Sequence, residues 1–320
     1  MNHRNSINFS FPRQMGILLM LIGGGIIMGA LVSALVWLGM TGQSPSNMQT
    51  DMADPKNYYA IITLQAVTTF FIFFLPSWIF ARIYYRKPGE FTGFHTRFNV
   101  KQLIWMVVIL ALTFPLSGTL SELTRTMPLP EAWKVKFDAM EAAREAQEAI
   151  LIKINSLNKY FISLILIGIL PAIFEEILFR GVLQNVLTKW FKGPWVAIIL
   201  TAFVFSIIHA SFYGFFVRFA LGIILGLVFY YSRSLWLVII FHFLYNGLQV
   251  TALYLLNLKG TVNLKDLDGS FPFWAGALAT GLLIYALKRF KDISWKEQEV
   301  FKYTEPDDPE NFHDWIAKNS

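Results

Sequence analysis

Long apolar runs dominate the sequence, and charged residues are concentrated in the segments between them. Most runs approach the roughly 20 residues that a helix needs to cross the hydrocarbon core of a bilayer. They lack the apolar–polar alternation of a membrane β-strand, so their backbone polar groups must be satisfied within helices. The pattern predicts an all-α protein, a polytopic transmembrane helical bundle of about eight spans. The predicted spans are residues 15–40, 58–81, 102–120, 160–183, 195–212, 216–231, 235–256 and 271–288.

The composition of the chain is also that of a membrane protein. Hydrophobic residues make up 55% of it and charged residues only 15%, whereas soluble domains carry about 25% charged residues. The absence of cysteine excludes disulfides, a thiolate nucleophile and cysteine-ligated metal sites. The net charge of +6 is interpreted as marking cytoplasmic loops and not nucleic-acid binding, because basic residues collect on the cytoplasmic side of membrane proteins.

Basic residues in the short loops predict the orientation of the chain. The loop 82–101 contains five Lys or Arg residues, whereas the loop 41–57 contains only Lys56. Lys and Arg also follow the fourth and eighth predicted spans. The sequence therefore predicts a multi-pass protein of the cell membrane with both termini cytoplasmic. The loop 121–159 would lie outside, and its six basic residues are balanced by six acidic ones.

The spans and loops divide the chain into five segments, one of which is a long insertion. Within this insertion, Trp133, Phe137 and Met140 recur at spacings of three and four residues, which predicts an amphipathic helix. We interpret it as a helix lying on the membrane or packed on the bundle, with a lid over a substrate entrance as the alternative. The segments are a three-span region (1–120), the extramembrane insertion (121–159), a core (160–256), a loop with the last span (257–288) and a cytoplasmic tail (289–320).

Ionisable residues within the spans are costly in a bilayer, so each is a candidate functional residue. The fourth span contains the adjacent acids Glu175 and Glu176, followed by Arg180. Glu176 and Arg180 are four residues apart and can pair, whereas Glu175 lies about 100° around the helix. One carboxylate can therefore be held ionised while the other serves acid–base chemistry. Gln184 and Asn185, one turn further on, predict a polar approach from the cytoplasm.

Two further spans carry polar side chains that can meet these acids. The fifth span holds Phe205 and His209, and the seventh holds His242 and Asn246, each pair four residues apart on one helix face. Three helices thus offer two carboxylates, two imidazoles and an amide to one interior point. Any one of these groups can simply hold helices together. The occurrence of all of them together favours a catalytic role.

These residues fit two hydrolytic mechanisms. In the first, which needs no cofactor, Glu175 with His209 activates a water for attack on a peptide carbonyl. His242 and Asn246 then donate hydrogen bonds to the developing oxyanion. In the second, Glu175, His209 and His242 bind zinc, which supplies the activated water. The ligand types suit zinc, although the H-E-x-x-H spacing is absent.

Two features of the sequence bear on how these spans pack. In the sixth span, Gly222 and Gly226 form a G-x-x-x-G pattern that predicts a close helix contact within the bundle. A single site also requires His209 and His242 to lie at similar depth. Counted along continuous spans at 1.5 Å per residue, they lie about 21 Å and about 11 Å from the inner ends of their helices. Only tilt, kinks or different helix ends would bring the two histidines together.

The motif set resembles that of the CPBP intramembrane proteases, which comprise the type II CAAX prenyl endopeptidases and the bacterial bacteriocin-processing and immunity proteins. The resemblance covers about residues 160–256 and identifies this segment as a catalytic core. The motifs occur in the family's order, each within a predicted span, as Glu175-Glu176-x-x-x-Arg180, Phe205-x-x-x-His209 and His242-x-x-x-Asn246.

The resemblance implies a role for each of these residues. Glu175 is similar to the family's water-activating acid, with His209 assisting. Glu176 and Arg180 are similar to the pair that shapes the site. The matching positions for the oxyanion donors are His242 and Asn246. The implied activity is that of an endopeptidase of the glutamate type.

The resemblance also implies a partner, which is a peptide or protein in or at the membrane, such as a prenyl-protein-like substrate cut close to its C-terminus. The lipid bilayer is the other partner, and nucleic acid is not expected. Two alternatives use the same residues. One is a membrane scaffold or immunity protein that works by binding. The other is a proton-coupled transporter, in which carboxylates and histidines relay protons and inverted repeats are expected.

Overall fold

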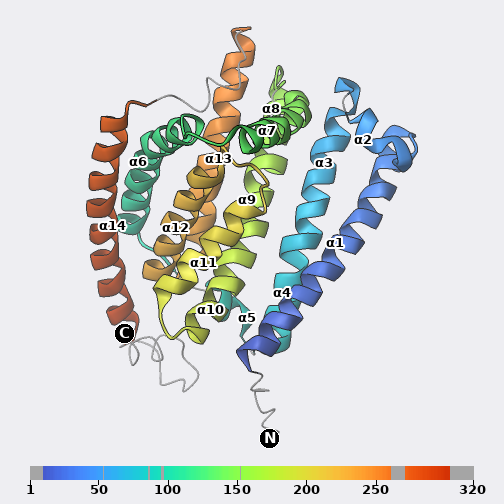
Figure 1. Cartoon of the computed structure of the whole chain (residues 1–320). Helices are drawn as coiled ribbons and strands as arrows, with labels where there is room; N and C mark the ends of the chain where they lie inside the picture. Colours follow the sequence, from blue (N-terminus) through green and yellow to red (C-terminus); the bar gives the residue numbers. More distant parts are fainter. Residues whose placement is uncertain are drawn as a thin grey trace, which may run out of the picture.

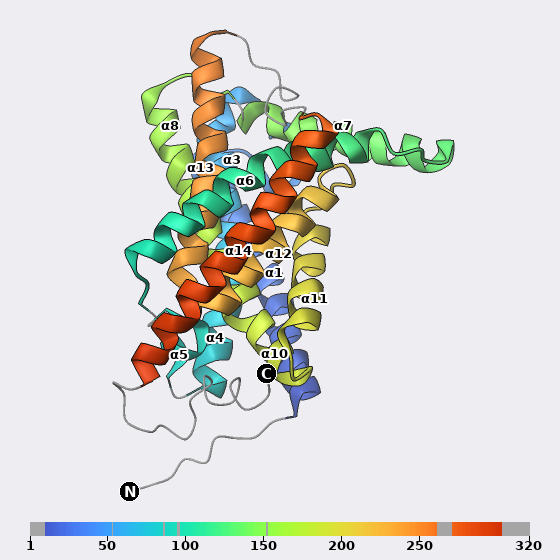
Figure 2. The ribbon, with the colours of Figure 1, turned by 90° about the vertical axis from the view of Figure 1, so that its left-hand side faces the viewer.

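Helices account for all regular secondary structure in the part of the chain that the computed structural model describes, which is residues 10–52, 54–85, 87–94, 97–151, 153–260 and 271–302. Most helices run along one direction and form a bundle, and α7 lies across one end of it (Figure 1, Figure 2). At the opposite end, α1 begins and α14 ends. Much of the predicted loop before the last span, and the predicted tail beyond residue 302, lie outside the described residues.

The elements, in chain order, are α1 (Phe11–Thr41), η1 (Pro45–Asn47), α2 (Met48–Asp51), η2 (Pro55–Asn57), α3 (Tyr58–Thr69), η3 (Phe70–Phe74), α4 (Leu75–Tyr84), α5 (Pro88–Thr92), α6 (Val100–Arg125), α7 (Glu131–Leu151), α8 (Leu157–Ser163), η4 (Leu164–Ile169), α9 (Leu170–Glu176), η5 (Ile177–Gln184), α10 (Asn185–Trp190), α11 (Pro194–Ile207), α12 (Phe215–Ser232), α13 (Leu235–Leu258) and α14 (Phe273–Lys302).

Six helical segments of the described chain are long and apolar enough to cross a membrane. The prediction of an all-helical, multi-pass membrane protein is therefore confirmed at this level. The fifth predicted span is the apolar helix α11, which has only 14 residues and ends at Ile207. The eighth lies within α14, which is not among the six. The candidate spans are Phe11–Thr41, Pro55–Tyr84, Val100–Arg125, Leu157–Trp190, Phe215–Ser232 and Leu235–Leu258.

The outer surface of the bundle is apolar. On α1, the side chains of Leu19, Ile27 and Leu35 are 61%, 64% and 69% exposed. Soluble monomers rarely expose contiguous apolar faces of this kind. A helix that is hydrophobic on all sides is suited to burial in lipid, where these side chains replace water contacts by acyl-chain contacts.

Two of the long helices contain π-helical turns immediately before a proline. The segment η3 precedes Pro76 of α4, and η4 precedes Pro171 of α9. A proline lacks an N–H, and its ring crowds the carbonyl four residues earlier. A π turn, with hydrogen bonds reaching back five residues, lets each helix continue past this obstacle. A third π segment, η5, follows Glu176, so α9 lies between two segments of a kind often found at functional sites.

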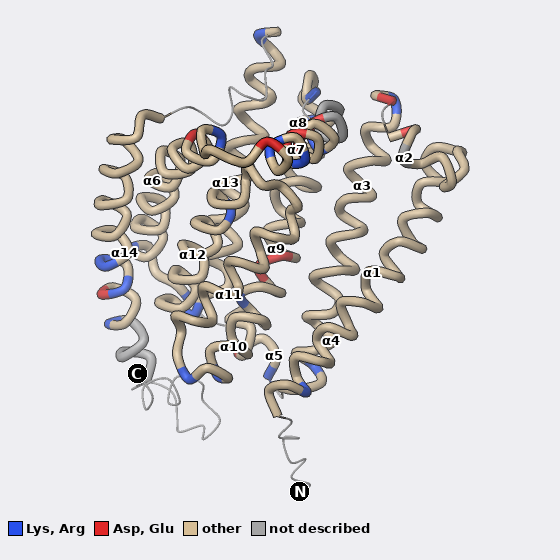
Figure 3. The backbone as a smooth tube through the Cα atoms, viewed as in Figure 1, with Lys and Arg blue, Asp and Glu red and all other residues tan. Residues whose placement is uncertain are grey.

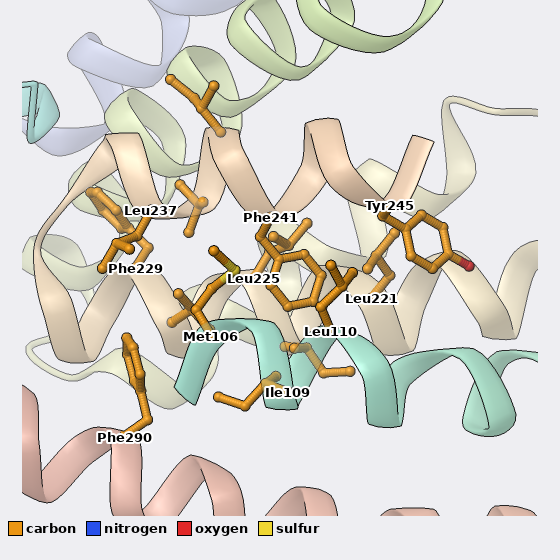
Figure 4. Packing of buried hydrophobic residues seen from close by; sticks show 14 of the residues in the cluster. Met106, Ile109, Leu110, Leu221, Leu225, Phe229, Leu237, Phe241, Tyr245 and Phe290 are labelled. Atoms are coloured by element: carbon orange, nitrogen blue, oxygen red, sulfur yellow. The ribbon is translucent and has the colours of Figure 1, made fainter. Parts of the chain in front are cut away.

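The helix α9–η5 lies between two hydrophobic cores. The larger core joins α6, α12, α13 and α14, and Figure 4 shows Met106 and Ile109 packing with Leu225 and Phe241 in it. The second core joins α1, α4, α5, η5, α10 and α11. Ile177 belongs to the first core and the next residue, Leu178, to the second. The acids at the end of α9 are therefore placed where the two cores meet.

Small residues fix α1 to its neighbours. A Cβ added to Gly25 would lie 2.0 Å from the carbonyl oxygen of Phe71, and one added to Gly29 would lie 3.1 Å from the Cβ of Phe71. One turn further, Ser33 Oγ and Thr68 Oγ1 are hydrogen-bonded at 3.2 Å. Glycine and serine stripes let membrane helices approach closely. The position of α1 against α3 and η3 depends on this stripe.

We expect Gly25→Ala to lower the midpoint of thermal unfolding in detergent. The added methyl group must push α1 away from η3, and overpacking of this kind costs about 1–3 kcal/mol. Gly24→Ala is the matched control, because a Cβ at Gly24 meets nothing within 4 Å. The control should keep or raise the midpoint, since alanine is the better helix former. Equal midpoints for the two variants would contradict the close contact.

Candidate active site

A buried ion pair forms the centre of the candidate site. Glu176 of α9 and Arg180 of η5 are both 0% exposed, and Arg180 Nη1 donates to Glu176 Oε1 over 2.9 Å. His242 of α13 donates from Nδ1 to the same oxygen over 2.7 Å. Because an ionised carboxylate only accepts, the Nδ1 of His242 carries its proton. Figure 3 shows the acidic residues of α9 about half-way along the bundle, apart from the charges gathered at its two ends.

The second acid, Glu175, lies on the other side of the same imidazole. Its Oε2 is 3.9 Å from His242 Nε2, and the residue as a whole is 8% exposed. The two adjacent carboxylates therefore flank one histidine ring. Glu176 accepts hydrogen bonds from two cationic or imidazole donors, whereas the nearest partner of Glu175 is the second ring nitrogen of His242. The adjacent acids Glu175 and Glu176 therefore have different surroundings.

Phe205 links the histidines and the ion pair. Its ring is 1% exposed and lies 4.9 Å from the guanidinium carbon of Arg180. The same ring is 5.0 Å from the ring of His209 and 6.0 Å from that of His242. A cation over an aromatic face is attracted by the ring quadrupole, most strongly where water is excluded. Phe205 therefore packs against Arg180 and makes T-shaped contacts with both imidazoles.

His209 follows the end of α11 and is partly exposed. Its Nδ1 donates to the carbonyl oxygen of Phe205 over 2.7 Å, since a carbonyl can only accept. In the neutral ring, Nε2 is then the nitrogen with a free lone pair. The two histidines do lie at similar depth, because both imidazoles contact the same phenyl ring of Phe205.

Asn246 lies one helical turn after His242 on α13 and is partly exposed. It does not join the hydrogen-bonded group of Glu176, Arg180 and His242 in the described structure. The geometry therefore brings five of the six predicted site residues into one connected group, with Asn246 beside it on the same helix. Its predicted role as an oxyanion donor remains a prediction.

Gln184 and Asn185 do not line a polar approach, which corrects the expectation from the sequence. Each is 1% exposed. Gln184 Nε2 donates to the carbonyl of Gly226, and Asn185 Nδ2 donates to the carbonyls of Phe91 and Gly181. Buried amides find backbone acceptors when no water is available. These side chains fasten neighbouring segments to the helix that carries the acids.

The glycines of α12 provide acceptors that the sequence analysis did not assign. Arg180 Nη2 donates to the carbonyl of Gly222 over 3.2 Å, one turn before the Gly226 carbonyl that Gln184 uses. A Cβ on Gly222 would lie 2.8 Å from the Cβ of Ala202. The G-x-x-x-G pattern does mark a close contact within the bundle, and the absence of side chains there exposes two carbonyls to η5.

The zinc alternative requires Glu175, His209 and His242 to converge on one ion. Within the described residues, no group of three His, Asp or Glu side chains is arranged so that it could hold a metal ion. With Nδ1 of His242 bonded to Glu176 and Nδ1 of His209 bonded to a backbone carbonyl, only the Nε2 atoms of the two rings could bind an ion. The residues present do not fit a three-ligand zinc site, which needs side-chain donors at about 2 Å from the ion.

The fold and the site define a multi-pass helical membrane protein with a buried cluster of acids, an arginine and histidines. More particularly, residues 157–248 match the family model of the Rce1-like proteins, the type II CAAX prenyl endopeptidases. The match contains every predicted site residue and confirms the resemblance found in the motifs. No curated protein and no solved structure matches the chain.

We expect Glu176→Ala to destabilise the protein far more than Glu175→Ala. Removing one member of a buried ion pair leaves the other charge uncompensated, which costs about 3–5 kcal/mol. Glu176 is the hydrogen-bonded partner of Arg180, whereas the contact of Glu175 within the described residues is the longer one with His242. Unfolding midpoints measured in one detergent would test this. Equal losses for the two adjacent acids would contradict the separate roles.

Proposed function

We propose that the protein is an intramembrane endopeptidase that hydrolyses peptide bonds of membrane-associated or prenyl-protein-like substrates through a water activated by Glu175. The observation that carries this proposal is the pair of buried acids around His242. Glu176 is held by Arg180 and His242, while Glu175 faces Nε2 of the same ring. A structural ion pair needs no second buried carboxylate, and an intramembrane acid without such a pairing is a functional residue by default.

In the proposed reaction, Glu175 removes a proton from water as the water oxygen bonds to the peptide carbonyl carbon. His209 assists by accepting a hydrogen bond from the same water at Nε2, because its Nδ1 is occupied by the carbonyl of Phe205. The tetrahedral intermediate then collapses and the C–N bond breaks. The proton held by Glu175 passes to the leaving nitrogen, which gives an amine, a carboxylic acid and the original carboxylate.

His242 and Asn246 are the proposed donors to the oxyanion of the tetrahedral intermediate. When both ring nitrogens are protonated, His242 can donate from Nε2 while Nδ1 stays on Glu176. Asn246 adds an amide donor from the next turn of α13. Loss of one donor of this kind typically lowers kcat about 10²–10³-fold.

We further propose that the chain crosses the cell membrane eight times, with the shorter α11 counted as one crossing, and that both termini are cytoplasmic. The arrangement in Figure 1 supports this, because α1 begins and α14 ends at the same end of the bundle. Basic residues gather at that end, as positive-inside topology requires (Figure 3). Arg82 lies in the last turn of α4 and Lys189 in the last turn of α10. The proposed catalytic core extends over residues 160–256.

Quantitative mass spectrometry of protein termini tests the activity. Deletion strains of the source cell would carry the wild-type chain, Glu175→Ala or Glu122→Ala at equal abundance. We expect a set of membrane-associated C-termini to appear with the wild type and to disappear with Glu175→Ala, because the attacking water loses its base. Glu122 is an exposed acid at the end of α6, outside the site, so Glu122→Ala should keep the wild-type set.

Identical termini in all three strains, under conditions where the wild type restores a deletion phenotype, would overturn the proposal. If Glu175→Ala also restored the phenotype, a scaffold or immunity role that needs no chemistry would replace the protease. If Glu175→Ala failed to restore it while termini stayed unchanged, the acids would serve proton movement, as in a coupled transporter.

A further inference from the structure

The loop that carries His209 is short and conformationally strained. This loop, residues 208–214, connects α11 to α12 and is called the His209 loop here. Ala210 directly after His209 has a φ of +48°, which non-glycine residues rarely adopt. Such a conformation costs about 1–3 kcal/mol and persists only where its surroundings enforce it. The position of His209 therefore depends on what holds this loop.

α7 supplies the contacts that hold the His209 loop. It lies across the end of the bundle (Figure 1). Three successive loop residues each have a partner on α7, and the partners lie on one face of that helix. The pairs are Ser211 Oγ donating to Glu141 Oε2 over 2.9 Å, the Phe212 ring stacked on the Phe137 ring with centroids 4.1 Å apart, and Tyr213 Oη donating to Asp138 Oδ1.

Glu141 is the buried acid of this interface. It is 7% exposed on a helix whose neighbouring residues are mostly exposed. Burial raises the pKa of Glu141, but hydrogen bonds from Arg144 and Ser211 and the charge of Arg144 outweigh it, so the pKa lies below its usual value. The carboxylate therefore stays ionised at neutral pH and accepts strongly. An amphipathic surface helix needs no buried acid, so Glu141 calls for a specific explanation.

Ser211 transmits the contact to the loop backbone. Its hydroxyl donates to Glu141 and accepts from the N–H of Gly214 over 3.1 Å. The same hydroxyl thus closes the loop and ties it to α7. On the other side, the N–H of Ala210 donates to the carbonyl of Ile207 over 2.9 Å. His209 lies within this turn, two residues before Ser211, so a shift of Ser211 is transmitted to the backbone that carries the imidazole.

We propose that Glu141 is a positioning residue for His209, acting through Ser211, and that α7 is a fixed support of the active site. This inference rests on the proposed function of the site. It assigns a role to the insertion before the catalytic core, whose residues carry none of the three motifs. A support must stay docked during turnover, whereas a lid must leave. Locking α7 in place should therefore leave the activity intact if α7 is a support and should block it if α7 is a lid.

Steady-state kinetics with a peptide taken from the Glu175-dependent termini tests the positioning role. We expect Glu141→Ala to lower kcat roughly 10–100-fold with KM changed less than about twofold, because misplacing a catalytic group by about 1 Å can cost 10²-fold. Ser211→Ala should lower kcat at least as much, because it also removes the acceptor of the Gly214 N–H. The double variant should be no worse than Ser211→Ala, since both substitutions break the Glu141–Ser211 contact. An unchanged kcat in Glu141→Ala would overturn the proposal.

Two control variants separate positioning from general damage to the fold. Glu141→Gln keeps one carbonyl acceptor for Ser211 and should recover most of the lost kcat. Glu131→Ala removes an exposed acid from the first turn of the same helix and should leave kcat unchanged. A loss in Glu131→Ala as large as that in Glu141→Ala would overturn the specific role of Glu141.

Cross-linking tests the docking without relying on activity, and the absence of native cysteines makes it clean. A Phe137→Cys, Phe212→Cys double variant should be joined by a short bifunctional thiol reagent, with a lower yield when Glu141→Ala is added. If the cross-linked protein keeps its activity, the result agrees with α7 as a fixed support of the active site. If the cross-linked protein is inactive and regains activity when a cleavable reagent is cut, α7 acts as a lid and the proposal of a fixed support is overturned.

The two proposals fail in distinguishable ways. A wild-type protein without Glu175-dependent cleavage would overturn the protease, while the cross-linking yields would still show whether Glu141 holds the His209 loop. Yields that do not respond to Glu141→Ala would overturn the positioning role, whether or not the protein is a protease.

Discussion

The ionised carboxylate of Glu176 is the group on which the interior of the bundle depends. An ion of this kind costs several kcal/mol to bury, and only direct charge partners with good geometry offset that penalty. Arg180 comes from the next turn of the same helix and His242 from α13. Arg180 also reaches the Gly222 carbonyl of α12. One buried charge therefore fixes how α9–η5, α12 and α13 sit relative to each other.

This constraint also explains why two adjacent acids can differ in purpose. Glu176 is satisfied by its donors and cannot leave them without stranding Arg180. Glu175 shares the same desolvated surroundings but meets only the far nitrogen of His242. The ring of Phe205 packs against Arg180 and also contacts both imidazoles. The charge that organises the helices and the acid proposed to act on water are thus separate groups joined by one histidine.

Much of this arrangement could be predicted from the sequence, because the determining signals are local. Apolar runs define the helices, and i, i+4 spacing places Glu176 with Arg180 on one face. The end of α11 could not be predicted in this way, since the apolar run continues to Phe212 and the turn depends on Ala210 and on contacts with α7. Nor do Gln184 and Asn185 look different in sequence from residues that line a channel. Their acceptors are backbone carbonyls of distant segments, which carry no side-chain signature.

The shortness of α11 has a consequence for the surrounding lipid. Fourteen residues make a helix about 21 Å long, well short of a hydrocarbon core about 30 Å thick. Non-helical backbone at membrane depth is tolerated only where protein or water covers it. In the turns that follow Ile207, the N–H groups of Ile208, His209 and Ala210 donate to preceding carbonyls, and α7 contacts the residues after them. A membrane adapts to such a mismatch by thinning locally. Local thinning shortens the path from bulk water to the acids, so the proposed hydrolysis should depend on the thickness of the bilayer.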